Sequence, residues 1–347
     1  MQVKTAKAAI LAESRKPLIV DDITLPETLD VGQVLVKVLY STICGAQLNE
    51  IAAAKGPDKF LPHLLGHEAS AKVLEIGPGV TNVKSGDTVV LHWRPSLGIQ
   101  CHPPAYSWRG ARLNAGWVTT FNEYAVVSEN RMTVIPGDSD MKAAPLFGCA
   151  ITTAAGVISN DAKLKLGESV VVFGVGGVGL NVIQFADLAG ANPIIAVDLI
   201  DEKLEMAKQR GATHLVNPSR LDVASEVRKI VGDAGPDKVI ETTGVKSVIE
   251  QAYELTHADG TCVLVGVPRE KVTIYTLPIH FNKTLTGSHG GSARPHIDIP
   301  RIMRLASAGR ISFEGIITDE YPLDEVNSAL DKMLSGRSGR ILLRIGS

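Results

Sequence analysis

The feature that most constrains the fold is an apolar strand pattern that runs directly into a glycine-rich turn and then into an apolar helix pattern. The strand is expected over 170–174 and the helix over 179–188. The glycines follow the spacing G-x-G-x-x-G, which in this strand-turn-helix setting is typical of a dinucleotide-binding βαβ unit, with the pyrophosphate at the helix N-terminus. The residues expected to contact the dinucleotide are Gly174, Gly176, Gly177, Val178 and Gly179.

An acidic residue ends the next predicted strand, as a ribose-binding site requires. Asp198 follows the apolar run 194–197, where its carboxylate can accept hydrogen bonds from the adenosine ribose. The same charge would repel a 2′-phosphate, and the next residues are Leu199 and Ile200 rather than arginine. The sequence therefore predicts NAD rather than NADP as the cofactor.

Two patterns divide the chain. Short β-rich runs with glycine, proline and Asn/Asp turns extend from about residue 7 to 136, and apolar strands alternate with helix-period segments from about 142 to 268. A last strand, 340–345, has no helix after it, so the tail is expected to rejoin the first domain. We predict an α/β protein with a doubly wound parallel Rossmann sheet at 151–290 and a discontinuous β-rich catalytic domain at 1–150 and 291–347.

Composition argues against several classes of function. Lys plus Arg number 35 and Asp plus Glu 37, so the basic excess that nucleic-acid binding needs is missing. The first twenty residues lack a signal-peptide core, and glycines and polar residues interrupt the most apolar stretch, 169–190, so neither export nor a membrane span is expected. Widely spaced cysteines favour reduced thiols or metal ligands and a cytoplasmic location; they are Cys44, Cys101, Cys149 and Cys262.

Cys44, His67 and Cys149 are candidate ligands of a catalytic zinc ion. Two thiolates and one imidazole would leave the fourth position open for water or substrate, and Glu68 could join them as a transient ligand. Taken singly, a cysteine is more often a small buried hydrophobe and a histidine more often a hydrogen-bonded core residue. Spacing alone therefore does not decide whether these residues meet.

Three motifs at these residues resemble, in order, the catalytic-zinc motifs of the medium-chain dehydrogenase/reductase family, in its polyol-type alcohol dehydrogenase branch. They are Ile43–Gly45, Leu65–Glu68, and Gly148–Cys149 followed by Thr152–Thr153. The resemblance covers essentially the whole chain and implies a GroES-like catalytic domain. It also implies hydride transfer between an alcohol and NAD at a single catalytic zinc ion held by Cys44, His67 and Cys149, with Glu68 beside them.

The same resemblance implies further contacts with the cofactor. Thr153 would lie against the nicotinamide ring, Val267 at the carboxamide end, and Arg340 against the pyrophosphate. Lys203 is placed like a lysine that contacts the adenosine ribose, and the alternative is a solvated helix charge. With the strand ends 241–244 and 265–267, the cofactor contacts that this resemblance adds are Lys203, Thr243, Val265, Val267 and Arg340.

The segment that follows the first zinc cysteine departs from the family pattern at three residues. Ala46 stands where a serine or threonine usually relays the alcohol proton, Gln47 where an aspartate is common, and Asn49 where a histidine can end the relay. A neutral Gln47 should alter the charge around zinc and its partner arginine. The proton is expected to leave through water, Glu68 or another pocket residue, unless the chemistry is not simple alcohol oxidation.

The segment 92–117 departs as well. Many relatives bind a structural zinc ion there through four cysteines, whereas this chain has only Cys101, so no structural zinc is expected and the pair Cys101-His102 is interpreted as an ordinary loop. The three residues that follow strand 88–91 are candidates for lining a substrate pocket suited to a polyol, sugar derivative or acid. The alternative is that they are a solvated charge beside a buried tryptophan. These three residues are His92, Trp93 and Arg94.

Three functions are compatible with these features. The first is a zinc- and NAD-dependent dehydrogenase of a polar small molecule. The second is a zinc-free reductase of alkenes or quinones, which needs no thiolate ligands, and the third is a non-catalytic cofactor-binding relative. Apart from an alcohol or carbonyl substrate, the expected partner is a second copy of the chain, in a homodimer or homotetramer formed through a sheet edge near Val272–Tyr275.

Overall fold

The computed structural model describes residues 1–54, 56–336 and 338–346. These residues divide into two compact units, the first consisting of Met1–Cys149 with Arg294–Ser347 and the second of Ala150–Ala293. The sequence predicted these domains as 1–150 with 291–347, and 151–290. Among the described residues, every helix is too short or too polar to span a bilayer.

The first unit is built on two sheets. One has the strand order β4-β1-β2-β7-β8, and the other has the order β10-β6-β5-β3-β18-β17, with β9 also pairing with β3. The strands are β1 (Thr5–Leu11), β2 (Ile19–Thr24), β3 (Gln33–Ile43), β4 (His63–Leu64), β5 (Ala69–Ile76), β6 (Thr88–Leu91), β7 (Tyr106–Trp108), β8 (Ala111–Leu113), β9 (Tyr124–Ser128), β10 (Met132–Val134), β17 (Ile317–Pro322) and β18 (Arg340–Arg344). The helices are α1 (Gly45–Ile51), α7 (Pro295–Ser307) and α8 (Val326–Leu334).

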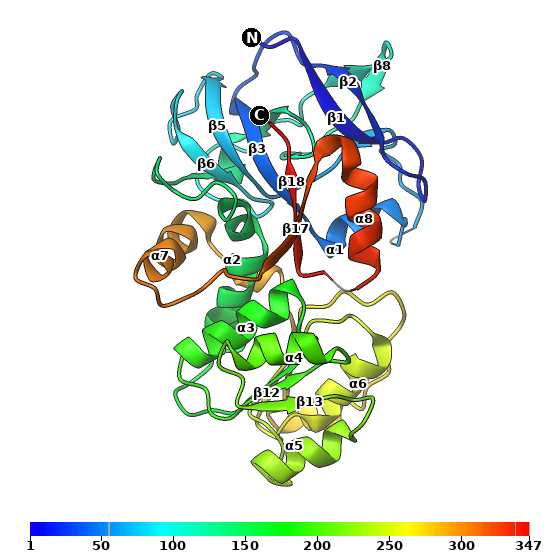
Figure 1. Ribbon diagram of the computed structural model, residues 1–347, viewed down its shortest axis with the longest axis vertical. Helices are drawn as coiled ribbons and strands as arrows, with labels where there is room; N and C mark the ends of the chain where they lie inside the picture. Colours follow the sequence, from blue (N-terminus) through cyan, green and yellow to red (C-terminus); the bar gives the residue numbers. More distant parts are fainter. Residues whose placement is uncertain (55, 337, 347) are drawn as a thin grey trace. The chain divides into compact units, whose positions relative to one another are not determined.

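The end of the chain completes the second of these sheets. Strand β18 pairs antiparallel with β3, with Ile341 opposite Ile43 and Arg344 opposite Tyr40, and Figure 1 shows the red and blue strands side by side. Four of the five residues of β18 are buried. Burial of this apolar strand explains why the tail returns to the first unit, as its lack of a following helix predicted.

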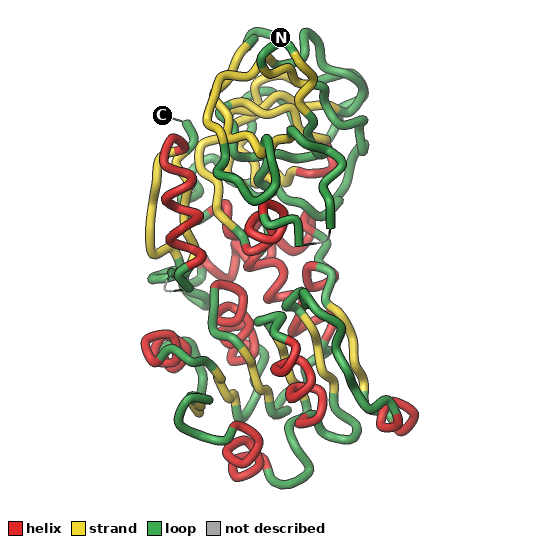
Figure 2. Tube along the Cα trace, turned by 90° about the vertical axis from the view of Figure 1, so that its right-hand side faces the viewer, coloured by secondary structure: helices red, strands yellow, loops and turns green. Residues whose placement is uncertain are grey.

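The second unit is a parallel sheet with the strand order β13-β12-β11-β14-β15-β16, and Figure 2 shows helices beside its strands. This is the doubly wound order, with the switch between β11 and β14, so the predicted fold class is confirmed. The strands are β11 (Val170–Phe173), β12 (Ile194–Val197), β13 (His214–Val216), β14 (Lys238–Glu241), β15 (Thr261–Leu264) and β16 (Thr284–Gly287). The helices are α2 (Ala150–Gly156), α3 (Gly177–Leu188), α4 (Asp201–Lys208), α5 (Val223–Val231) and α6 (Lys246–Leu255).

The structure corrects two expectations in this unit. Helix α3 begins at Gly177 rather than Gly179, because Gly176 is the residue that caps it. The segment Val272–Tyr275 is not a strand, and the outermost strand on that side is β16. The side chains of Val272–Tyr275 alternate between half-buried and exposed, as in a strand. Within the described chain, however, no neighbouring strand forms a hydrogen-bonded ladder with this segment.

Buried charged residues organise the loop that follows β6. Both oxygens of Glu129 accept backbone hydrogen bonds, one from Thr81 and Asn82 and the other from Ile99. Arg131 is 5% exposed and donates to the carbonyl of Trp93 and to the side chain of Gln100. Polar contacts thus hold this loop, and nothing in the sequence distinguishes these residues from solvated charges.

Replacing Glu129 with glutamine should lower the free energy of unfolding by about 1.5–3 kcal/mol at neutral pH, because the amide turns one acceptor into a donor facing N–H groups. Burial opposes the charge of Glu129, but the hydrogen bonds from Ile99, Asn82 and Thr81 hold its pKa below the ordinary 4.5. The carboxylate therefore stabilises the fold fully above about pH 4.5 and loses this effect as pH falls through the lower folded pKa. In denaturant unfolding, the difference in free energy of unfolding between the variant and the wild type should become smaller at acid pH. A difference that does not change with pH contradicts this role of the Glu129 carboxylate.

Candidate functional site

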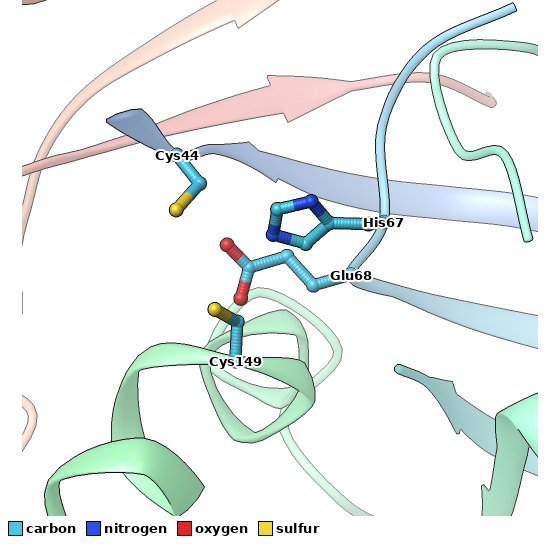
Figure 3. Close-up of side chains that lie close together, drawn as sticks. All are labelled: Cys44, His67, Glu68 and Cys149. Atoms are coloured by element: carbon cyan, nitrogen blue, oxygen red, sulfur yellow. The ribbon is translucent and has the colours of Figure 1, made fainter. Parts of the chain in front are cut away.

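Four side chains with metal-binding atoms converge in the first unit. One ligand atom from each of Cys44, His67, Glu68 and Cys149 lies within 4.8 Å of the others. Cys44 follows β3, His67 and Glu68 precede β5, and Cys149 precedes α2, so segments far apart in sequence meet here (Figure 3). The site brings together every residue that the sequence suggested as a metal ligand.

Two glycines allow the ligand segments to approach each other. Gly66 has φ +87°, and a Cβ there would lie 2.2 Å from the Thr120 hydroxyl oxygen. A Cβ on Gly148 would lie 2.4 Å from the carbonyl oxygen of Leu91 and 2.7 Å from the Cβ of Glu68. No larger side chain fits at either place, so the residues flanking His67 and Cys149 determine how closely the ligands pack.

The buried polar atoms of the cluster fit a cation. His67 Nε2 and Glu68 Oε2 are buried and have no hydrogen-bond partner, which is costly unless another group satisfies them. A hydrogen bond from Cys149, opposed by burial and aided by His67 and Arg340, holds the pKa of the Cys44 thiol well below its usual range. Two thiols, an imidazole and a carboxylate at this spacing form a donor set of the kind that zinc prefers.

Arg340 lies at this cluster. It is 4% exposed, forms an ion pair with Glu68, and donates a hydrogen bond of 3.0 Å to the Thr42 hydroxyl. The ion pair gives the buried carboxylate a countercharge and fixes its orientation. The contact of Arg340 with the cofactor pyrophosphate, expected from the resemblance, stays a prediction, and the sequence did not reveal its pairing with Glu68.

Gln47 connects helix α1 to His67. Its Oε1 accepts a 2.9 Å hydrogen bond from the backbone N–H of Cys44, and its Nε2 lies 2.7 Å from His67 Nδ1. The side chain is buried, with 1% of the residue exposed. The sequence marked Gln47 as a departure from the family pattern, but only the tertiary structure reveals that it contacts two of the candidate ligand residues.

In the second unit, the glycines between β11 and α3 differ in their surroundings. Gly174 has φ +84°, and a Cβ on Gly179 would lie 1.9 Å from the carbonyl oxygen of Gly174, so both are required by the close strand-to-helix packing. A Cβ on Gly176 would have no atom within 4 Å. The backbone at Gly176 is therefore open to a ligand, as a pyrophosphate site needs; contact of Gly177 and Val178 with the cofactor stays a prediction.

The predicted ribose acid is anchored beside this turn. Asp198 accepts hydrogen bonds from the backbone N–H groups of Val175, at 2.7 Å, and Ile200, at 3.0 Å. The glycine-rich turn and the end of β12 thus hold the carboxylate in one place. Lys203 lies half-buried in α4 and Thr153 is buried in α2, and their contacts with a cofactor stay predictions.

A buried carboxylate that sequence analysis missed organises the adjacent strand ends. Glu241 is fully buried, and its side chain accepts hydrogen bonds from the backbone N–H of Thr243 and Gly244. Its backbone carbonyl accepts from Val265 at 2.7 Å. Burial raises the pKa of Glu241 despite these hydrogen bonds. An acid that ends an apolar strand, Lys238–Glu241, is the signal that could have identified it.

The predicted substrate residues have different environments. His92 is 1% exposed, and its ring nitrogens bond to the carbonyl of Arg94 at 2.8 Å and to the Thr133 hydroxyl at 2.9 Å. Burial lowers its pKa to about 4, so the ring is neutral near pH 7, and its place in a substrate pocket stays a prediction. Trp93 and Arg94 are half-buried, with the guanidinium 5.7 Å from the indole ring.

Comparison with known proteins agrees with this architecture. Residues 30–137 match the alcohol dehydrogenase GroES-like domain, and residues 177–308 match the zinc-binding dehydrogenase domain. Alcohol dehydrogenase class-3 of Cereibacter sphaeroides is 34% identical over 96% of this chain and 98% of its own. Alcohol dehydrogenase class-P of Arabidopsis thaliana is 31% identical over 100% and 99%.

Solved structures are similar over their full length. An alcohol dehydrogenase zinc-binding domain protein from Burkholderia ambifaria has a TM-score of 0.90 at 27% identity, covering 99% of both chains. Benzyl alcohol dehydrogenase from Acinetobacter calcoaceticus has a TM-score of 0.88 at 26% identity, covering 99% and 100%. 2R,3R-butanediol dehydrogenase from Bacillus subtilis has a TM-score of 0.79 at 29% identity, covering 98% and 99%.

A doubly wound sheet with an open glycine turn, together with a cysteine and histidine cluster in a GroES-like domain, defines the zinc-type medium-chain dehydrogenases/reductases. The full-length similarity is more specific, and this chain belongs to the zinc-dependent alcohol dehydrogenase family. It is an oxidoreductase that acts on small-molecule alcohols or carbonyl compounds with a nicotinamide cofactor and zinc.

Proposed function

We propose that this chain is an NAD-dependent alcohol dehydrogenase in which Cys44, His67 and Cys149 hold a single catalytic zinc ion, with Glu68 as a reserve ligand. The observation that carries the proposal is the convergence of these four side chains within 4.8 Å. The unpartnered Nε2 of His67 supports it, because a buried ring nitrogen without a hydrogen-bond partner suits a metal ligand. That no structural zinc is bound stays a prediction from the single cysteine in segment 92–117.

When bound, the metal ion would act as a Lewis acid that favours deprotonation of the alcohol. The chain's own residues prepare the site for this chemistry. Arg340 balances the charge of Glu68, which limits the negative charge that two thiolates and a carboxylate would otherwise concentrate. Since Ala46 has no hydroxyl, the alcohol proton is proposed to leave through water or through the unpartnered Oε2 of Glu68.

NAD is the proposed cofactor, since the Asp198 carboxylate stands at the end of β12 and a 2′-phosphate there would meet its charge. Large apolar side chains at the carboxyl ends of the parallel strands support a dinucleotide site, because the adenine and nicotinamide ends of a cofactor can cover them. They are Leu199, 68% exposed, Val245, 51%, and Val267, 61%. Thr153, Lys203, Thr243 and Val265 are proposed contacts of the same cofactor.

The proposed substrate is a polar secondary alcohol such as a polyol or sugar derivative. Half-buried Arg94 beside Trp93 offers charge and hydrogen-bond donors near the end of β6, which meets Gly148 next to the metal cluster. The similar Bacillus subtilis protein is a dehydrogenase of a diol, 2R,3R-butanediol. Charge and hydrogen-bond donors at this place would favour a substrate with several hydroxyl groups over ethanol.

Elemental analysis and turnover of the purified chain test this function together. We expect about one zinc ion per chain and reduction of NAD with polyols at a kcat/KM at least tenfold that with ethanol, since one additional charge-assisted hydrogen bond contributes about 1.5–3 kcal/mol. A folded protein without zinc that reduces quinones or alkenes contradicts the proposal. So does a protein that binds NAD and zinc but turns over no alcohol.

The proposed assembly is a homo-oligomer, and the proposed location is the cytoplasm. A homodimer or homotetramer is supported by apolar side chains that are exposed on one segment of the cofactor domain, and sedimentation of the purified chain tests it. These side chains are Tyr275, 69% exposed, Leu277, 47%, Ile279, 41%, and Phe281, 67%. A cytoplasmic location is supported by the four free cysteines, and fractionation of cells tests it.

A further inference from the structure

The amide of Gln47 can be oriented from its partners. The backbone N–H of Cys44 can only donate, so the Gln47 atom 2.9 Å away from it must be the oxygen. The amide nitrogen then faces Nδ1 of His67 at 2.7 Å. With the residue 1% exposed, water cannot readily replace either hydrogen bond. The N-cap residue of helix α1, Cys44, therefore holds the amide in one orientation through its backbone N–H.

This orientation determines which nitrogen of His67 carries the proton. An amide NH2 group only donates, so Nδ1 of His67 must accept, and a neutral imidazole then carries its proton on Nε2. Nε2 is the buried nitrogen that has no hydrogen-bond partner and belongs to the metal cluster. In the metal-free protein, the nitrogen needed as a ligand is thus protonated and faces the other ligand atoms of the cluster.

We propose that Gln47 is a positioning residue that couples metal binding at His67 to a rotation of its own amide. This inference rests on the proposed ligand set. Ligation through Nε2 requires the proton to move from Nε2 to Nδ1 by way of solvent, with no net gain or loss. The amide must then turn so that its oxygen accepts from Nδ1–H, which removes the acceptor of the Cys44 N–H. The proton shift and the amide rotation cost free energy, and this cost weakens metal binding.

Glutamate at position 47 would avoid the exchange because it has nearly the same shape and two acceptor oxygens. One oxygen could accept from the Cys44 N–H while the other accepts from Nδ1–H of His67. We expect Gln47→Glu to bind zinc at least about tenfold more tightly than the wild type, in the range found for partners of metal-ligating histidines. Competition with a chromophoric chelator at fixed pH measures this affinity without any assay of activity.

Two further variants separate hydrogen bonding from charge and packing. Asn49→Asp adds the same negative charge to α1 two residues further along, at a half-buried position outside the metal cluster, and should change zinc affinity by less than about threefold because solvent and salt partly screen that charge. Gln47→Leu keeps the volume but provides no acceptor, and should bind zinc more weakly than the wild type. Equal affinities of the wild type and Gln47→Glu would overturn the proposal, and so would an equal gain in Asn49→Asp.

Nitrogen-15 NMR of histidine-labelled, metal-free protein tests the proton position independently of zinc affinity. The expected spectrum has His67 with Nδ1 unprotonated and Nε2 protonated, and the opposite arrangement after zinc is added. His67 is assigned by loss of its signals in His67→Asn. Protonated Nδ1 in the metal-free wild type refutes the role of Gln47 even if zinc binds, whereas failure of the wild type to bind zinc refutes the ligand set itself.

Discussion

Replacing Cys149 with serine should remove the bound zinc ion and lower kcat/KM for alcohol oxidation by about a thousandfold or more. The Sγ atom belongs to the group of ligand atoms within 4.8 Å of one another, and a serine hydroxyl does not ionise to replace a thiolate. Loss of a Lewis acid that stabilises the transition state by several kcal/mol corresponds to a rate loss of this size. Elemental analysis and steady-state kinetics on the same preparation measure both effects.

Cys101→Ser is the matched control. Cys101 is 5% exposed and lies in the same unit, but it is outside the metal cluster, and burial raises the pKa of its thiol. This variant should retain its zinc and its activity even if it is somewhat less stable, because the new hydroxyl is buried. If Cys149→Ser keeps a full complement of zinc, or if both variants lose it equally, the ligand set is wrong.

Replacing Asp198 with serine should lower kcat/KM with NAD by about tenfold to a hundredfold and raise it with NADP. The carboxylate is held by the N–H groups of Val175 and Ile200, so its charge stays at the place where the ribose is expected. Removing it takes away an acceptor for the ribose hydroxyls and the repulsion of a 2′-phosphate, each an effect of a few kcal/mol at most. Initial rates with the two cofactors at equal alcohol concentration give the ratio.

Asp201→Asn provides the comparison for a loss of charge nearby. Asp201 begins α4 and pairs with Arg220 at an exposed position, so its replacement should leave the preference for NAD within about twofold of the wild type. An unchanged preference in Asp198→Ser, or the same change in both variants, would show that Asp198 does not select the cofactor.

The fold followed from local patterns. The apolar strand, glycine turn and helix at 170–188 predicted β11 and α3 closely, because hydrophobic period and the conformational freedom of glycine act over a few residues. The same reasoning identified Lys238–Glu241 as a strand. The sheet edge that was expected near Val272–Tyr275 is instead formed by β16, because in the described part of the chain no strand pairs with that segment. A strand exists only as part of a ladder, and the partner is distant in sequence.

The metal cluster was accessible from the sequence only through resemblance, since Cys44, His67 and Cys149 lie on three separate segments. What surrounds the cluster was less accessible. The ion pair of Glu68 with Arg340 joins residues 272 positions apart. The hydrogen bond of His92 with the Thr133 hydroxyl likewise joins the end of β6 to β10, 41 residues further along the chain. Such contacts have no local signature because they arise from packing between strands.

The sequence by itself determined the doubly wound cofactor unit and the acid at the end of β12, Asp198, because each depends on residue type and short-range spacing, whereas it pointed to the candidate ligands through resemblance. Only the tertiary structure decided which buried groups act on those ligands. Gln47 lies against His67, and Arg340 lies against Glu68. The physical reason is that hydrogen-bond direction and desolvation depend on every atom within a few ångströms, and the folded chain assembles that surrounding from segments that the sequence keeps far apart.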